Sequence, residues 1–132
     1  MDSLAGVPLL VIEDDADCLS LMTELLEQAG AVVTSATNGN DALRAFASGH
    51  PRVVVSDIGL PDLDGFDLMQ RFRAAKGKAP FGGLAVTAYG SPAHVERAMR
   101  SGFDALLRKP IDIDRLLQVV SRLASEHIAN DA

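Results

Sequence analysis

The chain has 132 residues, 48% of them apolar and 23% charged, which fits one globular domain with a hydrophobic core. Its 18 acidic and 12 basic residues give a net charge of −6, and this disfavours nonspecific nucleic-acid binding because such binding needs a basic face. The single cysteine, Cys18, excludes an internal disulfide and suits a reducing compartment, so we expect a cytoplasmic protein. Neither an 18-residue apolar run nor a basic segment followed by an apolar one is present, so neither a membrane span nor a signal peptide is expected.

The N-terminal part of the chain predicts one strand followed by one helix. Residues 1–7 show no periodic pattern and are expected to form a loose leader. Residues 8–12 form a continuous apolar run, which predicts a buried strand that ends at Glu13-Asp14. Asp15 or Asp17 is expected to cap the next helix, because a carboxylate accepts the free amide hydrogens of a first turn. The inward face of that helix is predicted to consist of Leu19, Met22, Leu25, Leu26 and Ala29.

Two further strand–helix pairs are predicted in the middle of the chain. Residues 31–36 predict a second strand, and residues 41–48 predict a short helix. Residues 52–55 are apolar and rich in valine, which predicts a third buried strand that runs out at Asp57. After a loop that proline and glycine keep irregular, a third helix is expected to begin near Phe66.

The last third of the chain predicts two more strands and two more helices. Residues 81–87 predict a fourth strand, and Ser91-Pro92 predicts a helix start with serine as the cap and proline at the first helical position. Residues 104–107 predict a short fifth strand, and a last helix is expected from Asp112. The inward residues of the fourth helix are predicted to be Val95, Ala98 and Met99. Those of the last helix are predicted to be Leu116, Leu117, Val119, Val120 and Leu123, and residues 129–132 are expected to be frayed.

Five strands alternating with five helices define the expected architecture. Strands that are apolar along their whole length imply a parallel sheet covered by helices on both sides. We expect residues 1–132 to form a single domain with a core of about residues 8–125. All strands of a parallel sheet end at one edge, so Glu13-Asp14, Asp57, Thr87 and Lys109 are predicted to meet there if the strand order brings them close.

Such a group of side chains is suited to phosphoryl transfer. Three neighbouring carboxylates repel one another, and either a hard divalent cation such as Mg²⁺ or the ammonium group of Lys109 offsets that repulsion. The cation and the lysine would offset charge on the phosphoryl oxygens, the Thr87 hydroxyl would donate to one of them, and Asp57 would attack phosphorus. Taken singly, each residue also has a structural explanation: a strand-end turn for Asp57, helix capping for Glu13-Asp14, an ordinary strand residue for Thr87 and a solvated loop lysine for Lys109.

The ordered set of motifs resembles the receiver domain of two-component response regulators. The motifs are Glu13-Asp14, Asp57 with Pro61 and Asp64-Gly65, Thr87-Ala88, and Lys109-Pro110, and together they cover roughly residues 8–125. The resemblance implies a flavodoxin-like (βα)5 fold, a doubly wound parallel α/β sheet of strand order 2-1-3-4-5. Residues 86–92 and 102–104 are most similar to receivers attached to hybrid sensor histidine kinases.

The resemblance also implies a role for each site residue. Asp57 would accept a phosphoryl group from the phosphohistidine of a sensor histidine kinase or a histidine phosphotransfer protein. Asp14 would bind Mg²⁺ directly, Glu13 mostly through water, and Asp57 and the backbone carbonyl of Gly59 would be further ligands. Lys109 would contact the phosphoryl group, and the Lys109-Pro110 bond would be cis. Such a domain is not a turnover enzyme by itself, contacts neither nucleic acid nor membrane, and is compatible with a homodimer.

Two positions depart from the pattern of the family. Leu106 stands where many receivers carry a tyrosine or phenylalanine that rotates inward when the threonine moves, and leucine cannot do this in the same way. Tyr89, near the threonine, is either the substitute in switching or an ordinary surface residue. Gly59, two residues beyond Asp57, has no side chain that shields or orients attacking water, so no particular phosphoryl lifetime is implied.

Two other functions on the same fold remain as alternatives. A phosphatase of the aspartyl-phosphate type usually needs a second acid where Gly59 stands. A flavodoxin-like cofactor binder needs a phosphate-binding loop where Glu13-Asp14 would repel phosphate. The remaining chemical residues are expected to be ordinary: Asp62, Asp64 and Asp67 as loop acids with Asp64 fixing the turn, His50, His94 and His127 as surface residues, and Cys18 as an unreactive thiol.

Overall fold

The computed structural model describes residues 3–127, which form a five-stranded sheet alternating with five helices. All strand pairs are parallel, and the strand order is β2-β1-β3-β4-β5. The strands are β1 (Pro8–Ile12), β2 (Val32–Ala36), β3 (Val53–Asp57), β4 (Gly82–Thr87) and β5 (Ala105–Arg108). The helices are α1 (Ala16–Gln28), α2 (Gly39–Ser48), α3 (Gly65–Ala74), α4 (Pro92–Arg100) and α5 (Ile113–Glu126). The flavodoxin-like α/β fold predicted from the sequence is therefore confirmed.

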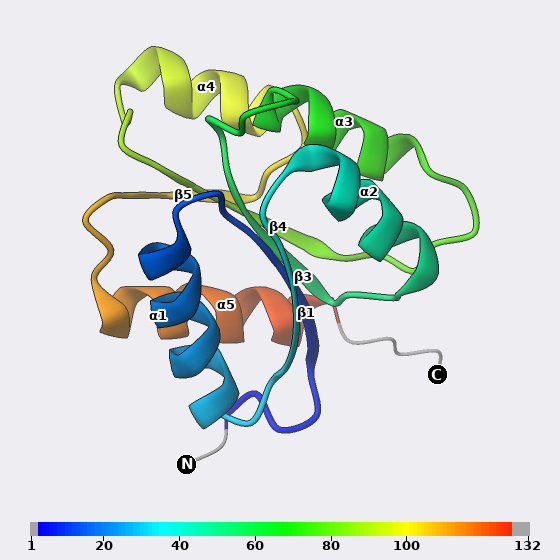
Figure 1. The fold of residues 1–132 in the computed structure, drawn as a ribbon, viewed down its shortest axis with the longest axis vertical. Coiled ribbons are helices and arrows are strands. Elements are labelled where there is room, and N and C mark those ends of the chain that lie inside the picture. Colours follow the sequence, from blue (N-terminus) through cyan, green and yellow to red (C-terminus); the bar gives the residue numbers. More distant parts are fainter. Residues whose placement is uncertain (1–2, 128–132) are drawn as a thin grey trace.

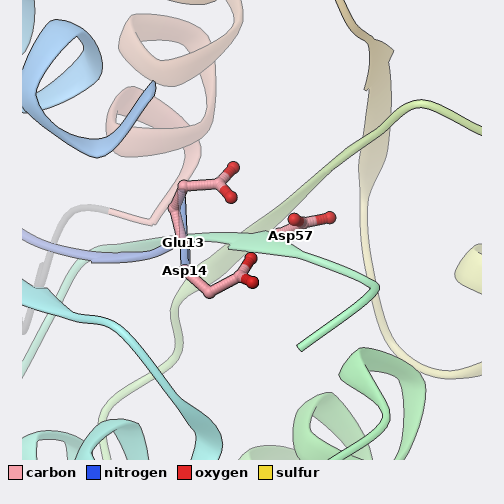
Figure 2. A group of neighbouring side chains, drawn as sticks. All are labelled: Glu13, Asp14 and Asp57. Atoms are coloured by element: carbon pink, nitrogen blue, oxygen red, sulfur yellow. The ribbon is translucent and has the colours of Figure 1, made fainter. Parts of the chain in front are cut away.

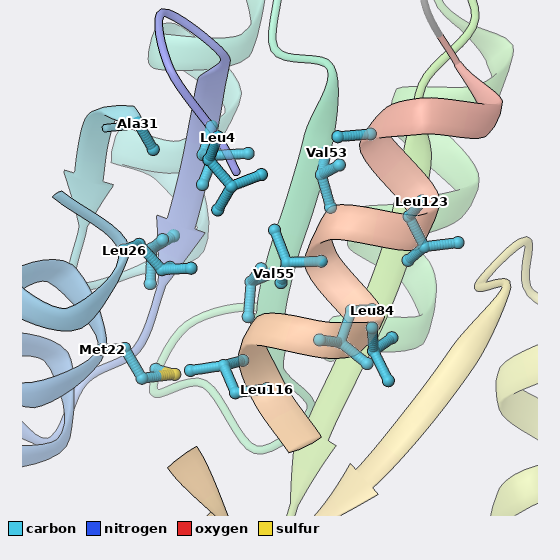
Figure 3. Packing of buried hydrophobic residues seen from close by; sticks show 14 of the residues in the cluster. Leu4, Met22, Leu26, Ala31, Val53, Val55, Leu84, Leu116 and Leu123 are labelled. Carbon is cyan, nitrogen blue, oxygen red and sulfur yellow. The ribbon is translucent and has the colours of Figure 1, made fainter. Parts of the chain in front are cut away.

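Helices cover both faces of the sheet, as the apolar strands require. Helices α1 and α5 lie on one face, and α2, α3 and α4 lie on the other (Figure 1). Alternate residues of one strand serve opposite faces: Val53 and Val55 pack with α1 and α5, whereas Val54 packs on the other side. Figure 3 shows the first of these two cores, with Met22 and Leu26 of α1 on one flank and Leu116 and Leu123 of α5 on the other.

The register of the strands brings their carboxyl ends to the same edge. Ile12 of β1 pairs with Ser56 of β3, and Asp57 pairs with Val86 of β4. Thr87 in turn pairs with Arg108 of β5. Residues that directly follow the strands are thus neighbours in space although they are far apart in the sequence.

Local capping sets where the helices begin, and one cap comes from a distant loop. Asp15, rather than Asp17, caps α1 and accepts from the amide of Cys18 at 2.9 Å. Helix α2 begins at Gly39, earlier than predicted, with Asn38 as its N-cap residue. Asp62 also accepts hydrogen bonds from the amides of Gly39 at 2.7 Å and Asn40 at 2.9 Å. The hydrogen bond from Gly39 has the larger effect, and together the two bonds lower the pKa of Asp62. Asp62 is an exposed loop acid, as expected, and its contact with the start of α2 is a further role that the sequence did not reveal.

Helix α4 differs from the prediction in its exposed face. Ala98 is fully buried, but Val95 and Met99 are 37% and 39% exposed. Helix α4 lies over the β5 edge of the sheet, where the last strand is only four residues long and offers little surface to cover. The predicted inward positions of Val95 and Met99 were therefore wrong.

The segment before β1 belongs to the core rather than to a loose leader. Leu4 is fully buried in the cluster between α1 and α5, and its amide donates to the carbonyl of Ala29 at 3.0 Å. The amide of Gly6 likewise donates to the carbonyl of Gly30 at 2.9 Å. The predicted leader was therefore wrong for residues 3–7, because one leucine in a short segment shows no periodicity. Residues 1–2 and the predicted frayed residues 129–132 lie outside the described part of the chain.

None of the helices within residues 3–127 combines the length and the apolar character that crossing a membrane requires.

Replacing Leu4 tests this N-terminal packing. We expect Leu4→Ala to lower the free energy of unfolding by roughly 2–4 kcal/mol, since truncating a buried leucine loses packing and leaves a cavity. The matched control is Leu21→Ala, whose side chain is 46% exposed, and we expect a loss below about 1 kcal/mol there. Urea denaturation of both variants measures the difference, and equal losses would contradict the role given to Leu4.

Candidate functional site

Three carboxylates meet at the carboxyl edge of the sheet. Oxygen atoms of Glu13, Asp14 and Asp57 all lie within 4.8 Å of one another, the only such group of acidic, histidine or cysteine ligands within residues 3–127 (Figure 2). Glu13 is fully buried and Asp57 is 8% exposed, whereas Asp14 is exposed. Carboxylate oxygens at this spacing can hold a divalent cation of the kind that prefers oxygen ligands.

The ends of β1 and β3 place these acids. The amide of Glu13 donates to the carbonyl of Ala36 at 3.0 Å, which continues the β1–β2 pairing by one residue and fixes the backbone there. Asp57 is the last residue of β3, and its Oδ1 accepts from the amide of Gly59 at 3.2 Å. The loop then folds back, and the amide of Gly65 donates to the carbonyl of Ile58 at 2.8 Å.

Gly65 is required for this close return of the chain. A Cβ atom at Gly65 would lie 2.6 Å from the Cα of Ile58 and 2.7 Å from the carbonyl oxygen of Asp57, both of them backbone atoms. Asp64 caps α3 by accepting from the amide of Phe66 at 2.7 Å, which agrees with its predicted role in fixing the turn. The motif Asp64-Gly65 therefore shapes the loop that follows the acidic cluster.

Lys109 lies between two of the three acids. Its Nζ atom is 2.7 Å from Oε1 of Glu13 and 3.2 Å from Oδ2 of Asp57. The amide of Lys109 donates to the carbonyl of Thr87 at 2.8 Å, so the backbone after β5 is held against the end of β4. The peptide bond between Lys109 and Pro110 is cis, as predicted.

Burial and charge oppose each other in this ion-pair network. Burial raises the pKa of Glu13, and the nearby charge of Asp57 raises it further, although the hydrogen bond from Lys109 works against the shift. Burial alone would lower the pKa of Lys109, but the hydrogen bond to Glu13 and the charge of Asp57 outweigh burial and raise it. The lysine is therefore firmly protonated, and the site carries more negative charge than the single ammonium group neutralises.

Thr87 lies at the same edge, while the two other predicted switch residues point elsewhere. Thr87 is the last residue of β4 and is 2% exposed, and its Oγ1 accepts from the amide of Tyr89 at 3.0 Å. The Tyr89 side chain is 63% exposed and stacks on His94, so His94 is more than the isolated surface residue expected from the sequence. Leu106 is half-buried and packs against the core beneath α3 and α4.

Gly59 borders an open part of the site. An added Cβ atom there would meet no heavy atom within 4 Å. The position two residues beyond Asp57 therefore leaves access for water, as expected from the missing side chain, and the role of the Gly59 carbonyl as a metal ligand stays a prediction.

Two neighbouring groups complete the picture of the site. The amide of Asp15 donates to Oε2 of Glu13 at 3.1 Å, a contact that sequence spacing alone did not reveal. Cys18 lies on the first turn of α1, where burial and then the charge of Glu13 raise the pKa of its thiol to about 11. Such a thiol is protonated at neutral pH, which agrees with its expected lack of reactivity.

The family is shown by comparison with known proteins. The family model described as response regulator receiver domain matches residues 9–121. The chain belongs to this family. The motifs identified in the sequence lie within the matched range, and the acidic cluster of Glu13, Asp14 and Asp57 is a typical receiver-domain site that could hold a metal.

Curated relatives of this receiver domain differ greatly in length. A protein of Leptolyngbya boryana, described as an uncharacterized 14.6 kDa protein in the sodA1 3′ region, is 37% identical over 122 residues, which are 92% of this chain and 93% of that protein. The sensor histidine kinase RcsC of Escherichia coli (strain K12) is 32% identical over 116 residues, but these cover 88% of this chain and only 12% of RcsC. The chain thus matches one relative almost end to end and the other over a small part.

Solved receiver structures share the fold closely. The Francisella response regulator 1452 receiver domain has a TM-score of 0.85 and 27% identity, with 92% of this chain and 98% of that chain covered. The DrrB receiver domain, solved in a BeF3-activated form, has a TM-score of 0.82 and 25% identity, with 91% and 98% covered.

The raised pKa of Glu13 predicts a pH-dependent effect of neutralising it. With its pKa raised by folding, ionised Glu13 lowers stability at neutral pH, so without divalent cations we expect Glu13→Gln to unfold at higher urea than the wild type. The wild type regains this stability as pH falls through the raised pKa toward the ordinary value of 4.5, because Glu13 then becomes protonated. The difference in stability between the wild type and Glu13→Gln should therefore shrink as the pH falls. A variant that is less stable at neutral pH would contradict this balance of burial and charge.

Proposed function

We propose that this receiver domain is a phosphoacceptor signalling module of a two-component phosphorelay, in which Asp57 takes a phosphoryl group from a partner's phosphohistidine. One observation carries the proposal: Lys109 contacts Asp57 and Glu13 while Asp14 completes a cation-sized group of oxygens beside them. Phosphorylation would then change the affinity of the domain for a partner.

The reaction needs only one bond to form and one to break. A carboxylate oxygen of Asp57 attacks phosphorus, the bond between phosphorus and the partner's imidazole nitrogen breaks, and the imidazole keeps the electron pair and takes up a proton. Asp57 suits this role because it lies at the end of a buried strand with its side chain held between a lysine and the amide of Gly59. The carboxylate of Asp57 is thereby held in place, with Oδ1 bonded to the amide of Gly59, where an added Cβ atom would meet no heavy atom within 4 Å.

Charge compensation is the main task of the residues around Asp57. Glu13, Asp14, Asp57 and the carbonyl of Gly59 would hold Mg²⁺, which supplies positive charge opposite the phosphoryl oxygens when bound. Lys109 would move its ammonium group from the Asp57 carboxylate to a phosphoryl oxygen, a short displacement from its present 3.2 Å contact. The Thr87 hydroxyl, which now accepts from the Tyr89 amide, still has its own hydrogen to donate to a second oxygen.

Membership of the receiver family supports a partner and a setting for this activity. A sensor histidine kinase or a histidine phosphotransfer protein would be the phosphoryl donor, acting on this domain in the cytoplasm. Residues 1–132 would act as one unit that catalyses its own phosphoryl transfer rather than turning over a substrate, and a homodimer is one form in which it can act. With a net charge of −6, the domain itself contacts neither nucleic acid nor an anionic membrane surface.

Labelling by a small acyl phosphate tests the acceptor. We expect Mg²⁺-dependent incorporation of one phosphoryl group into the wild type and none into Asp57→Ala, because within residues 3–127 only Glu13 and Asp57 contact a lysine and Glu13 is fully buried. Asp67→Ala, an exposed acid in the first turn of α3, is the matched control and should label like the wild type. Intact-protein mass spectrometry gives the count. Labelling of Asp57→Ala would refute the assignment, and multiple turnover on a phosphomonoester would favour the phosphatase alternative.

Stabilisation by Mg²⁺ tests the cation site separately. Because a cation relieves repulsion among the three carboxylates, we expect Mg²⁺ at a hundredfold excess over its dissociation constant to add about 2.7 kcal/mol to the free energy of unfolding. Asp14→Asn should remove most of this gain. Asp17→Asn, an exposed acid nearby and outside the cluster, should keep it. The measurement is urea denaturation with and without Mg²⁺, and an equal gain in both variants would contradict the proposed ligand set.

A further inference from the structure

The loop between β4 and α4 links Thr87 to a pair of stacked rings. The amide of Tyr89 donates to Oγ1 of Thr87 at 3.0 Å. The ring of Tyr89 lies 5.7 Å from the ring of His94, with an angle of 23° between the planes. One residue, Tyr89, therefore contacts both the candidate site and the first turn of α4.

His94 is itself held in place by the cap of α4. The hydroxyl of Ser91 and Nδ1 of His94 lie 2.6 Å apart and share a hydrogen bond. The amide of His94 also donates to the Ser91 hydroxyl oxygen at 3.3 Å, and Ser91 is the N-cap residue of the helix. The imidazole is thus a fixed platform, and it accounts for the position of a tyrosine ring that is otherwise mostly exposed.

Arg108 lies against the same loop at Gly90. A Cβ atom at Gly90 would lie 2.3 Å from Cδ and 2.4 Å from Cγ of Arg108, so the arginine stem occupies the space that a side chain at position 90 would need. Arg108 also pairs with Thr87 in the β4–β5 register. The loop from Thr87 to Ser91 is consequently held between the platform on α4 and the end of β5.

We propose that His94 is a positioning residue for the phosphoacceptor reaction, because its stack with Tyr89 holds the Thr87 hydroxyl in its resting orientation. This inference rests on the proposed function. When the hydroxyl turns toward a phosphoryl oxygen on Asp57, it leaves the Tyr89 amide, the loop shifts and the two rings separate. The signal then reaches the start of α4 directly along the backbone.

This route explains how the domain can switch with Leu106 in place of an aromatic residue. Leu106 packs in the core beneath α4 and has neither a polar group nor a ring that could follow Thr87. The Tyr89–His94 stack lies on the outside instead, and its opening changes the surface at the start of α4, next to the exposed Val95.

The sequence provides a specific reporter for this movement. Tyr89 is the only tyrosine, and the chain contains no tryptophan, so tyrosine emission reports on this loop alone. The probe is beryllofluoride with Mg²⁺, a phosphoryl mimic whose binding is followed independently by ¹⁹F NMR. We expect the emission of the wild type to change in step with binding, because the stacked imidazole leaves the tyrosine ring.

Substitution of His94 separates the stack from the other contacts. His94→Ala should show altered emission before any addition, a smaller change on binding, and roughly two- to tenfold tighter binding of beryllofluoride, since a restraint on the resting state is gone. His94→Phe keeps a flat ring without the bond to Ser91 and should restore wild-type affinity. Val95→Ala, the exposed neighbour on the same helix, is the control and should bind like the wild type.

Different results would contradict the positioning role of His94 and the phosphoacceptor role of Asp57. Bound beryllofluoride with unchanged wild-type emission, or wild-type affinity in His94→Ala, would overturn the positioning role of His94 and leave Asp57 as the acceptor. Failure of the wild type to bind beryllofluoride would overturn the proposed function, and the positioning role with it.

Discussion

The contact of Lys109 with two buried carboxylates is the interaction on which the site depends. The fold places Glu13 and Asp57 at the ends of neighbouring strands, where both lose much of their hydration, and a buried charge without a partner is costly. Lys109 reaches both acids from the end of β5 and offsets part of that cost. The remaining negative charge, to which Asp14 contributes, is what makes the site attractive to a cation. Stability of the domain without a cation and affinity for a cation therefore oppose each other.

The parallel sheet is what makes this contact possible. The three charged side chains of this contact, Glu13, Asp57 and Lys109, lie just at or beyond the carboxyl ends of β1, β3 and β5, and the strand order sets β1 beside β3. Because β1, β3 and β4 are buried on both faces, their apolar side chains leave little freedom for the register to slip. The position of the charged groups is thus determined by packing that lies well below them in the core.

Those relations were accessible from the sequence because they depend on strong local patterns. Mostly apolar runs identified the strands, and the parallel arrangement predicted that Glu13, Asp57 and Lys109 lie at one edge of the sheet. The strand order that brings them together was implied by the family resemblance. Contacts that depend on single residues from distant segments were not accessible: Leu4 in the core and Asp62 at the start of α2 give no periodic signal. The exposure of Val95 and Met99 depends on how much sheet lies under α4, which helical spacing does not reveal. The Tyr89–His94 stack likewise depends on the conformation of the loop between these two residues, which the sequence does not reveal.

The crossing of Arg108 over Gly90 has a consequence for how relatives of this chain can diverge. The two positions share one volume, so a larger residue at position 90 requires the exposed Arg108 side chain to turn aside or to be replaced by a shorter one. Substitutions at these two positions should therefore be correlated across natural variants of this domain, although eighteen residues separate them along the chain. A change at either position alters the mobility of the loop that carries Tyr89. Sequence differences at the end of β5 would therefore change how readily the domain switches.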